Sequence, residues 1–114
     1  YNLGKYKMHL FPNYKTVNIP ISGRNYTLYV ADDFEKRRKG LANIPFIPRN
    51  KGMLFKYDEP VCHAYTMEET QFPLKIIFFD ADFKQIGSFD AKAHQKEEVR
   101  PQSDFMYVIE ILGR

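Results

Sequence analysis

Glu110 is the ionisable residue whose position most strongly suggests chemistry. In a strand it would share one face with three apolar residues, Met106, Val108 and Leu112, because alternate residues point to the same side. A carboxyl group on a buried face requires a partner or a raised pKa. Glu110 could therefore act as a general base or a metal ligand. We favour a structural role, in which an Arg, a Lys or backbone N–H groups satisfy the charge or the face is simply exposed, since structural ion pairs also perturb pKa values.

Other acidic residues could join Glu110 in a carboxylate- or metal-dependent hydrolase. Glu68 and Glu69 are adjacent, and Asp32 precedes a candidate helix. Such an enzyme requires carboxylates that converge within metal-binding reach. Their positions in the sequence do not show this convergence, so hydrolysis is the last of three functional hypotheses.

The remaining reactive side chains form no recognisable catalytic or metal-binding motif. Cys62 and His63 are neighbours, which in a strand would place the thiol and the imidazole on opposite faces. The three histidines do not have metal-ligand spacing. There is no phosphate-binding glycine loop, nucleophile elbow or Cys-x-x-Cys pair. We therefore expect no catalytic residue, no metal and no cofactor, and we do not favour an enzyme.

A small-ligand site is the second hypothesis. Met53, Phe55 and Tyr57 fall on one face of a strand and could line a cleft, although such a stripe more often belongs to the core. The charged loop 66–72 follows in the sequence and is the best place for a cleft. A ligand such as a carbohydrate would contact four residues, namely Tyr57, Tyr65, Glu68 and Glu69.

The first 15 residues differ in composition from the rest of the chain. Aromatic residues alternate irregularly with basic ones here, with Tyr1, Tyr6, Phe11 and Tyr14 among Lys5, Lys7, His9 and Lys15. Such a mixture can bind single-stranded nucleic acid. We instead predict an extended arm that packs on its own domain or on a protein partner, since aromatic residues are enriched in interfaces. Its candidate contact residues are Tyr6, Phe11 and Tyr14.

Residues 16–114 are predicted to form a single β-rich domain. Apolar residues recur with a period of two in several short segments, which is the pattern of β-strands. The strands are expected at residues 17–21, 26–30, 53–57, 62–67, 74–80, 85–91 and 105–112. With one short helix, they predict a compact antiparallel β-sandwich or irregular barrel of about seven short strands.

Local signals indicate where some of these elements begin and end. Asp32 and Glu35 have the spacing of a helix capping box, so a helix should begin near Asp33. Gly40 should end that helix. Pro20 has no N–H group to donate, which places the first strand at an edge of the sheet.

The composition fits one domain and points away from nucleic acid. The chain has 114 residues, enough for one ordinary core. Its 17 basic and 14 acidic residues give a net charge of +3 and are interleaved, whereas nucleic-acid-binding proteins often gather basic residues on one face. No apolar run approaches the ~20 residues that span a bilayer. The chain begins at Tyr1, which would suit an exported or organelle-targeted protein with a removed leader, and the compartment stays open.

Several blocks of sequence, in order, resemble the domain-of-unknown-function 192 family over about residues 27–113. They are Val30-Ala31, Gly40-Leu41, Gly52-Met53-Leu54-Phe55, Met67, Thr70, Pro73-Leu74, Ile76-Ile77-Phe78 and Tyr107-Val108-Ile109-Glu110. The resemblance implies a compact, mainly β domain. It implies no reaction, because the biochemical role of this family is not established, although many members are exported or anchored prokaryotic proteins.

One charged block departs from the pattern of that family. The family usually has Trp-Met-Lys-Asn-Thr where this chain has Thr66-Met67-Glu68-Glu69-Thr70, and Pro-Leu-Asp where it has Pro73-Leu74-Lys75. A basic position has become acidic at Glu68, and an acidic position has become basic at Lys75. Because an ion pair survives a change of both signs, we predict that Glu68 or Glu69 pairs with Lys75 and that this block is structural.

The favoured function is a non-enzymatic binding or accessory domain within a larger protein assembly. It would engage a protein partner through the arm 1–15 and through the loops 42–51 and 66–72. Binding of a small ligand and hydrolysis are the alternatives. The natural partner, the ligand and the oligomeric state stay open.

Overall fold

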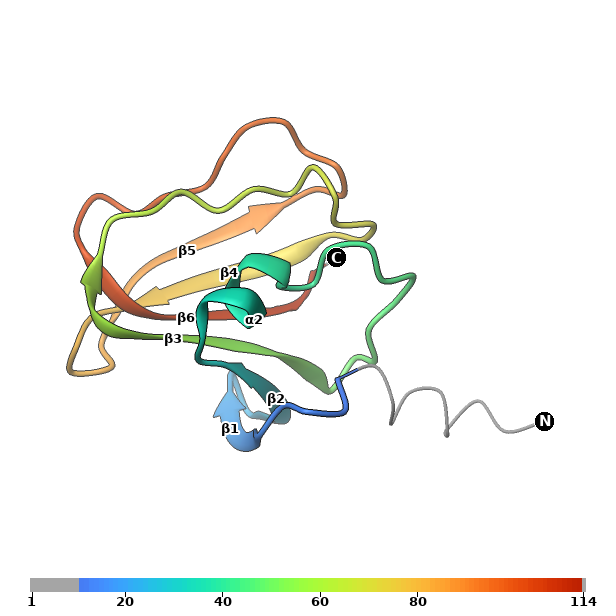
Figure 1. Cartoon of the computed structure of the whole chain (residues 1–114), viewed down its shortest axis with the longest axis horizontal. Helices are drawn as coiled ribbons and strands as arrows, with labels where there is room; N and C mark the ends of the chain where they lie inside the picture. Colours follow the sequence, from blue (N-terminus) through green and yellow to red (C-terminus); the bar gives the residue numbers. More distant parts are fainter. Residues whose placement is uncertain (1–10, 114) are drawn as a thin grey trace.

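The computed structural model describes residues 11–113, which contain one six-stranded β-sheet (Figure 1). The strands are β1 (Thr16–Ile21), β2 (Arg24–Ala31), β3 (Lys51–Val61), β4 (Leu74–Phe79), β5 (Gln85–Ala91) and β6 (Phe105–Leu112). They lie in the order β1-β2-β3-β6-β4-β5. A short helix, α2 (Phe34–Lys39), precedes β3. The prediction of a mainly β domain with one short helix is confirmed.

The sheet is open, and one of its strand pairs is parallel. Neighbouring strands are antiparallel except for β2 and β3, where Leu28 lies opposite Gly52. Parallel neighbours require a crossover connection, which here consists of α2 and residues 40–50. This crossover and the segment 62–72 lie over one face of the sheet (Figure 1). Irregular chain therefore covers that face where a sandwich would have a second sheet.

The third strand is longer than expected, and the strand expected next does not form. β3 continues through Asp58-Glu59-Pro60, where we expected a turn, and ends at Val61. Its pairing with β6 is irregular between Lys56 and Val61, so the missing N–H of Pro60 is tolerated. The residues expected as a strand at 62–67 contribute only the isolated bridge between Tyr65 and Val99. Residues 11–113 thus contain six strands where about seven were predicted.

The helix begins and ends where the sequence signals place it. Asp33 is the N-cap, and its carboxylate accepts a hydrogen bond of 2.8 Å from the Lys36 N–H. The N-cap residue is therefore Asp33, whereas the capping box suggested by the sequence would have used Asp32 and Glu35. Gly40 ends the helix with a positive φ of 50°. No helix in the described part of the chain is long and apolar enough to cross a membrane.

The first two strands form a hairpin at the edge of the sheet. Ser22 and Gly23 connect them with positive φ values of 49° and 80°, which is the geometry of a type I′ turn. Pro20 lies in β1, and β1 is an edge strand, as its missing N–H group predicts.

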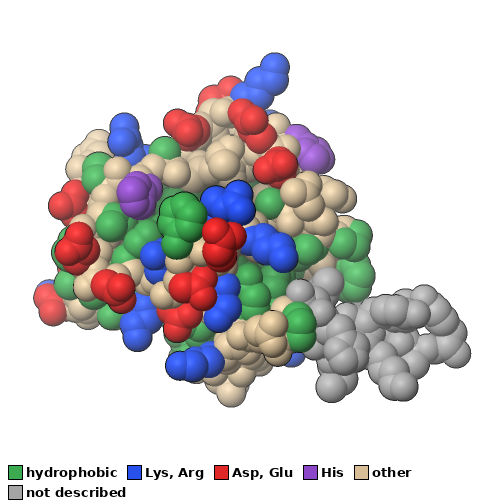
Figure 2. Space-filling model, in the orientation of Figure 1, with side chains coloured by type: hydrophobic (Ala, Val, Ile, Leu, Met, Phe, Trp, Pro, Cys, Tyr) green, Lys and Arg blue, Asp and Glu red, His purple; other side chains and the backbone are tan. Residues whose placement is uncertain are grey.

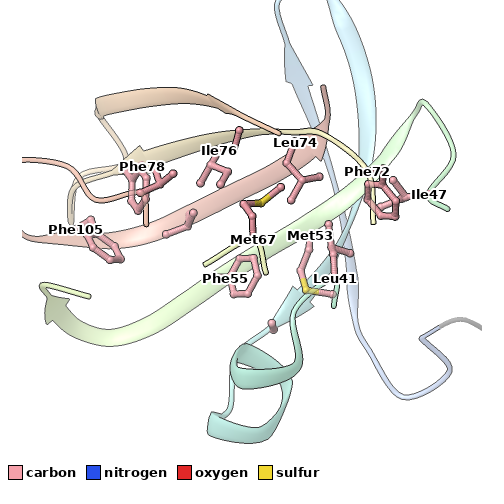
Figure 3. Close-up of a cluster of buried hydrophobic side chains, with 14 of the residues drawn as sticks. Leu41, Ile47, Met53, Phe55, Met67, Phe72, Leu74, Ile76, Phe78 and Phe105 are labelled. Atoms are coloured by element: carbon pink, nitrogen blue, oxygen red, sulfur yellow. The ribbon is translucent and has the colours of Figure 1, made fainter. Parts of the chain in front are cut away.

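The main hydrophobic core lies on the face that the crossover covers (Figure 3). Its labelled members in Figure 3 are Leu41, Ile47, Met53, Phe55, Met67, Phe72, Leu74, Ile76, Phe78 and Phe105. Met67 is fully buried there and anchors the segment 62–72 to the sheet. A smaller cluster on the opposite face consists of Leu28, Leu54, Ile109 and Ile111.

Gly52 has a steric reason to be glycine. A Cβ atom at this position would overlap the backbone oxygen of Glu110, and it would lie 2.8 Å from Ile111 Cγ2 and 2.9 Å from Leu28 Cδ2. The neighbouring strand β6 contributes the backbone atom, which a side-chain rotation cannot move. β3 can therefore keep its place between β2 and β6 only if this position carries no side chain.

The variant Gly52→Ala should lose at least about 2 kcal/mol of unfolding free energy, because β6 must shift to admit the methyl group. Urea denaturation measures this loss. Gly87→Ala on β5 is the matched control, since its Cβ would meet only the side chains of Phe89 at 3.2 Å and Pro101 at 3.4 Å. The control should cost less than about 1 kcal/mol, and equal losses in both variants would contradict the steric explanation.

Candidate ligand-binding pocket

A pocket of about 800 Å³ lies between α2, β3 and the segment 62–70. Glu110 of β6, Phe55 and Tyr57 of β3, and Tyr65 and Thr70 of the segment line its interior. Its rim carries charged residues of both signs, and acidic and basic side chains alternate over the face that bears α2 (Figure 2). The pocket thus combines aromatic walls, a few polar groups inside and a mixed rim.

Glu110 is the most unusual group in the pocket. It is only 5% exposed, and on the core face it lies between two fully buried neighbours, Met53 of β3 and Ile76 of β4. Burial raises the pKa of the Glu110 carboxyl to about 8, because an apolar environment disfavours the charged form. Near pH 7 Glu110 is therefore mostly a neutral acid, which can donate one hydrogen bond and accept others.

The Glu110 carboxyl has no protein partner within residues 11–113. The structural ion pair that we expected for it is not formed by the described residues. No fully enclosed side-chain oxygen or nitrogen in that range lacks a hydrogen bond. The unpaired oxygens of Glu110 therefore reach the surface of the pocket that this residue lines.

Two tyrosines of the same pocket join their hydroxyl groups. Tyr57 Oη and Tyr65 Oη are 2.7 Å apart. Burial raises the pKa of both phenols, that of Tyr65 well above its usual range, and the Glu110 charge adds to this rise. Both side chains stay neutral hydroxyl groups in the folded protein. The Tyr65 ring is also held by edge contacts with Phe55 and Phe78, at centroid distances of 5.1 Å and 5.6 Å.

Arg37 connects the helix to one wall of the pocket. Its guanidinium carbon lies 4.8 Å from the centroid of the Tyr57 ring, a cation–π contact. Its Nη1 donates a hydrogen bond of 2.9 Å to the backbone oxygen of Lys56. These two contacts fix the position of α2 over β3. Phe34, at the other end of this helix, is 67% exposed on the rim.

Backbone hydrogen bonds hold the segment 62–70 on both sides. Tyr65 and Val99 exchange two bonds of 2.8 Å, and the Asn43 N–H donates to the Glu69 oxygen at 2.8 Å. The His94 N–H donates to the backbone oxygen of Thr70 at 3.0 Å. The wall that carries Tyr65 and Thr70 is therefore tied to residues 92–99 and to the crossover.

Besides Phe55 of the predicted cleft-lining stripe, the structure brings four of the candidate site residues to this pocket. These are Tyr57, Tyr65, Glu69 and Glu110. Glu68 does not line it, and its backbone oxygen accepts a bond of 2.9 Å from His94 Nδ1. Asp32, the third carboxylate of the hydrolase hypothesis, lies instead 3.9 Å from Lys36 Nζ. Residues 11–113 contain no cluster of three or more metal-ligating side chains.

Lys75 does not meet Glu68 or Glu69. Its Nζ lies 3.9 Å from Asp90 Oδ1, because the register of β4 and β5 sets Lys75 opposite Asp90. Among the described residues no ion pair joins Lys75 to the block 66–70. That block is held by its backbone and by Met67 rather than by its charges.

The described end of the arm packs on its own domain. Phe11 is buried, and its ring lies 4.7 Å from that of Tyr29. Tyr14 contacts the Phe11 ring edge-on at 5.1 Å, and Lys36 Nζ lies 5.2 Å from the Tyr14 ring centroid. Tyr6 lies outside the described residues.

Sequence reasoning missed several pocket residues, chiefly Arg37, Phe34 and Thr70. Arg37 belongs to the run Lys36-Arg37-Arg38-Lys39, and only the rotation of the helix about its axis distinguishes it from its neighbours. Because α2 has no buried residue, no apolar periodicity reveals that rotation. The position of Thr70 offered a clue, because it lies three residues after Met67. A turn joins the two, in which the Thr70 N–H donates a hydrogen bond to the Met67 backbone oxygen.

The stability of the folded protein should depend on pH through Glu110. The pKa of its carboxyl is 4.5 ordinarily and about 8 in the folded chain. Between pH 4.5 and pH 8 the folded state therefore binds more protons than the unfolded state. The unfolding free energy should therefore fall as pH rises through this window, by roughly 3–5 kcal/mol in total. Glu110→Gln should lack this fall and should be more stable than the wild type at pH 9. Urea denaturation at pH 5, 7 and 9 measures both proteins.

Glu110→Asp serves as the control, because it keeps an ionisable carboxyl on the same strand position. It should retain a fall in stability with rising pH. A wild-type-to-Gln difference that stays constant from pH 5 to pH 9 would contradict the raised pKa of Glu110.

The tyrosine pair should show coupling in a double-mutant cycle. Tyr57→Phe and Tyr65→Phe each remove one hydroxyl from the 2.7 Å bond and should each cost about 1 kcal/mol. The double variant should cost clearly less than the sum, since the second change removes a hydroxyl that has already lost its partner. Strict additivity would show that the two hydroxyls do not interact in solution.

Two solved structures have the same fold as this chain. The crystal structure of a protein of unknown function from Novosphingobium aromaticivorans superposes with a TM-score of 0.75 at 21% identity, over 88% of this chain and 74% of that one. The crystal structure of a "putative transcription regulator" from Sinorhizobium meliloti gives 0.73 at 26% identity, over 88% of this chain and 82% of that one. No curated protein matches the chain.

The sequence also matches a family model over residues 17–113, which is most of the chain. The matched blocks include the β3 motif that begins at Gly52 and the strand that carries Glu110. The resemblance found in the sequence is thereby confirmed, and this chain belongs to the DUF192 family, described as "Uncharacterized ACR".

Proposed function

We propose that this domain binds a small organic ligand in the pocket above Glu110. The observation that carries the proposal is a carboxyl group that is 95% buried, has no protein partner within residues 11–113 and opens into a cavity of about 800 Å³. Cavities of about 300–1,000 Å³ with apolar walls and a few polar groups are typical of small-molecule sites.

The unpaired carboxyl supports binding because its residue lines the pocket and no described residue satisfies it. A buried polar group without a partner costs roughly 1–3 kcal/mol. A ligand that displaces water from Glu110 must therefore supply a hydrogen bond in its place. The hydroxyl pair of Tyr57 and Tyr65 belongs to the same pocket and offers further bonds to the same ligand.

The pocket supports binding better than catalysis. A general base or nucleophile is normally oriented by a hydrogen bond to a second group, and no such bond holds Glu110 among the described residues. The phenols of Tyr57 and Tyr65 have raised pKa values, so neither is poised to lose its proton near pH 7. The hydrolase hypothesis therefore gains no support from this geometry.

Partner binding through the arm 1–15 and the loops 42–51 and 66–72 stays a prediction. Phe11 and Tyr14 are used within the domain, which leaves Tyr6 as the arm residue still to be placed. The chain balances 17 basic residues with 14 acidic ones, and side chains of both signs alternate over the face that bears α2 (Figure 2), which does not favour nucleic acid.

Filling the pocket should abolish binding without unfolding the domain. Ala64 lines the pocket and is only partly buried, so Ala64→Phe should occupy its volume. Ligand-detected NMR with a library of neutral, cationic and anionic fragments should yield ligands for the wild type. Their affinity for Ala64→Phe should be at least about tenfold lower, since the same space cannot hold both.

Ala81→Phe is the matched control, because Ala81 is exposed in the turn before β5 and lies away from the pocket. It should bind the fragments as the wild type does. The proposal fails if the wild type binds no fragment, or if all three proteins bind them equally.

A further inference from the structure

We infer that the ligand of the Glu110 pocket is an uncharged, hydroxyl-rich molecule, namely a sugar, that hydrogen-bonds to Glu110, Thr70 and the Tyr57–Tyr65 pair. This inference rests on the proposed function and names the class of its ligand. Three features support it: the uncharged hydrogen-bonding groups inside the pocket, the paired or solvent-exposed charges around it, and its aromatic walls.

The interior of the pocket presents hydrogen-bonding groups without a permanent charge. Glu110 and Thr70 are each 5% exposed and line the pocket, and neither side chain has a hydrogen-bond partner within residues 11–113. Tyr57 and Tyr65 use one hydroxyl hydrogen for the bond between them, which leaves one donor and several acceptor lone pairs. The ligand must supply both donors and acceptors to satisfy these groups.

The positive charges near the pocket already have partners or lie in solvent. Arg37 is engaged by the Lys56 oxygen and the Tyr57 ring. Arg38 pairs with Glu35 at 3.2 Å, where both side chains are mostly exposed. A buried anionic ligand would need a buried counter-charge to compensate its desolvation, and the lining residues place none beside Glu110.

A cationic ligand is also disfavoured. Four acidic residues line the rim, Asp58, Glu59, Glu69 and Glu98, but all of them are exposed, where screening weakens their attraction. Inside, burial keeps Glu110 mostly neutral near pH 7. The titratable groups coupled to it are Tyr57 of β3 and Tyr65 of the segment 62–70, and both are neutral phenols near pH 7, so neither supplies a buried negative charge for a cation.

The walls fit a ring with one apolar face. Phe55, Tyr57 and Tyr65 contribute aromatic surface inside the pocket, and Phe34 offers an exposed ring on the rim. A sugar carries hydroxyl groups at its edges and C–H groups on its faces, so it can satisfy the polar groups while it covers the rings. A wholly apolar ligand would leave Glu110 and Thr70 without hydrogen-bond partners. A site with unpaired polar groups binds such a ligand weakly.

Three sugars that share one ring but differ in charge test the inference directly. Neutral glucose-based oligosaccharides would be compared with their glucosamine and glucuronic acid counterparts by isothermal titration calorimetry at pH 6. We expect at least one neutral oligosaccharide to bind about tenfold or more tightly than both charged counterparts, equivalent to one well-made buried hydrogen bond.

Variants of Glu110 supply the second readout. Glu110→Gln replaces the carboxyl that ionises with an amide that does not, so the test is how its affinity for the neutral sugar changes with pH and not the size of that affinity. Wild-type affinity should fall between pH 6 and pH 9 as the carboxyl ionises, whereas the affinity of Glu110→Gln should not. Ala64→Phe should bind none of the sugars.

The outcomes distinguish this inference from the proposed function. Preference for the amino sugar or the sugar acid, or wild-type affinity that rises with pH, overturns the uncharged class. Binding of fragments but of no sugar also overturns it, while the proposed function stands. If neither fragments nor sugars bind, both fail together.

Discussion

The parallel pairing of β2 with β3 is the constraint on which the rest of this structure depends. Two parallel neighbours cannot be joined by a tight turn, so the chain must leave the sheet after Ala31 and return at Lys51. The connection carries α2 across one face, where Arg37 contacts Tyr57, and it places Leu41 in the core. An antiparallel pair would need no such connection, and the pocket would then lack the element that forms one of its walls.

The opposite wall shows how irregular chain can be made rigid enough for a binding site. The segment 62–70 contains no strand, yet Met67 is fully buried and backbone bonds tie Tyr65, Glu69 and Thr70 to two other parts of the chain. Such support from a second layer of contacts is what holds functional side chains at fixed positions. Glu110 needs no equivalent support, because its strand is paired on both sides by β3 and β4.

Sequence reasoning succeeded where one physical rule acts on neighbouring residues and failed where distant segments must meet. Strand periodicity placed Glu110 on a buried face, and the lack of an N–H group placed β1 at an edge. The partner of Lys75 depends on the register of β4 and β5, which puts Asp90 opposite it. Likewise, the contact of Arg37 with the pocket depends on how a helix without buried residues is rotated over β3. Both are properties of the assembled sheet, and local residue patterns do not contain them.

Pro20 has a consequence for the molecule as a whole. Ile21 and Arg24 flank the two-residue turn and form the hydrogen-bonded pair of the hairpin, so the next pair, Pro20 and Asn25, points its backbone groups outward. The outer side of β1 is therefore missing one of the donors that an incoming strand would need. An open sheet is vulnerable to extension by a strand of another molecule, and this proline interrupts the template for such growth. The same residue that marks where the sheet ends also protects the protein from polymerising through that edge.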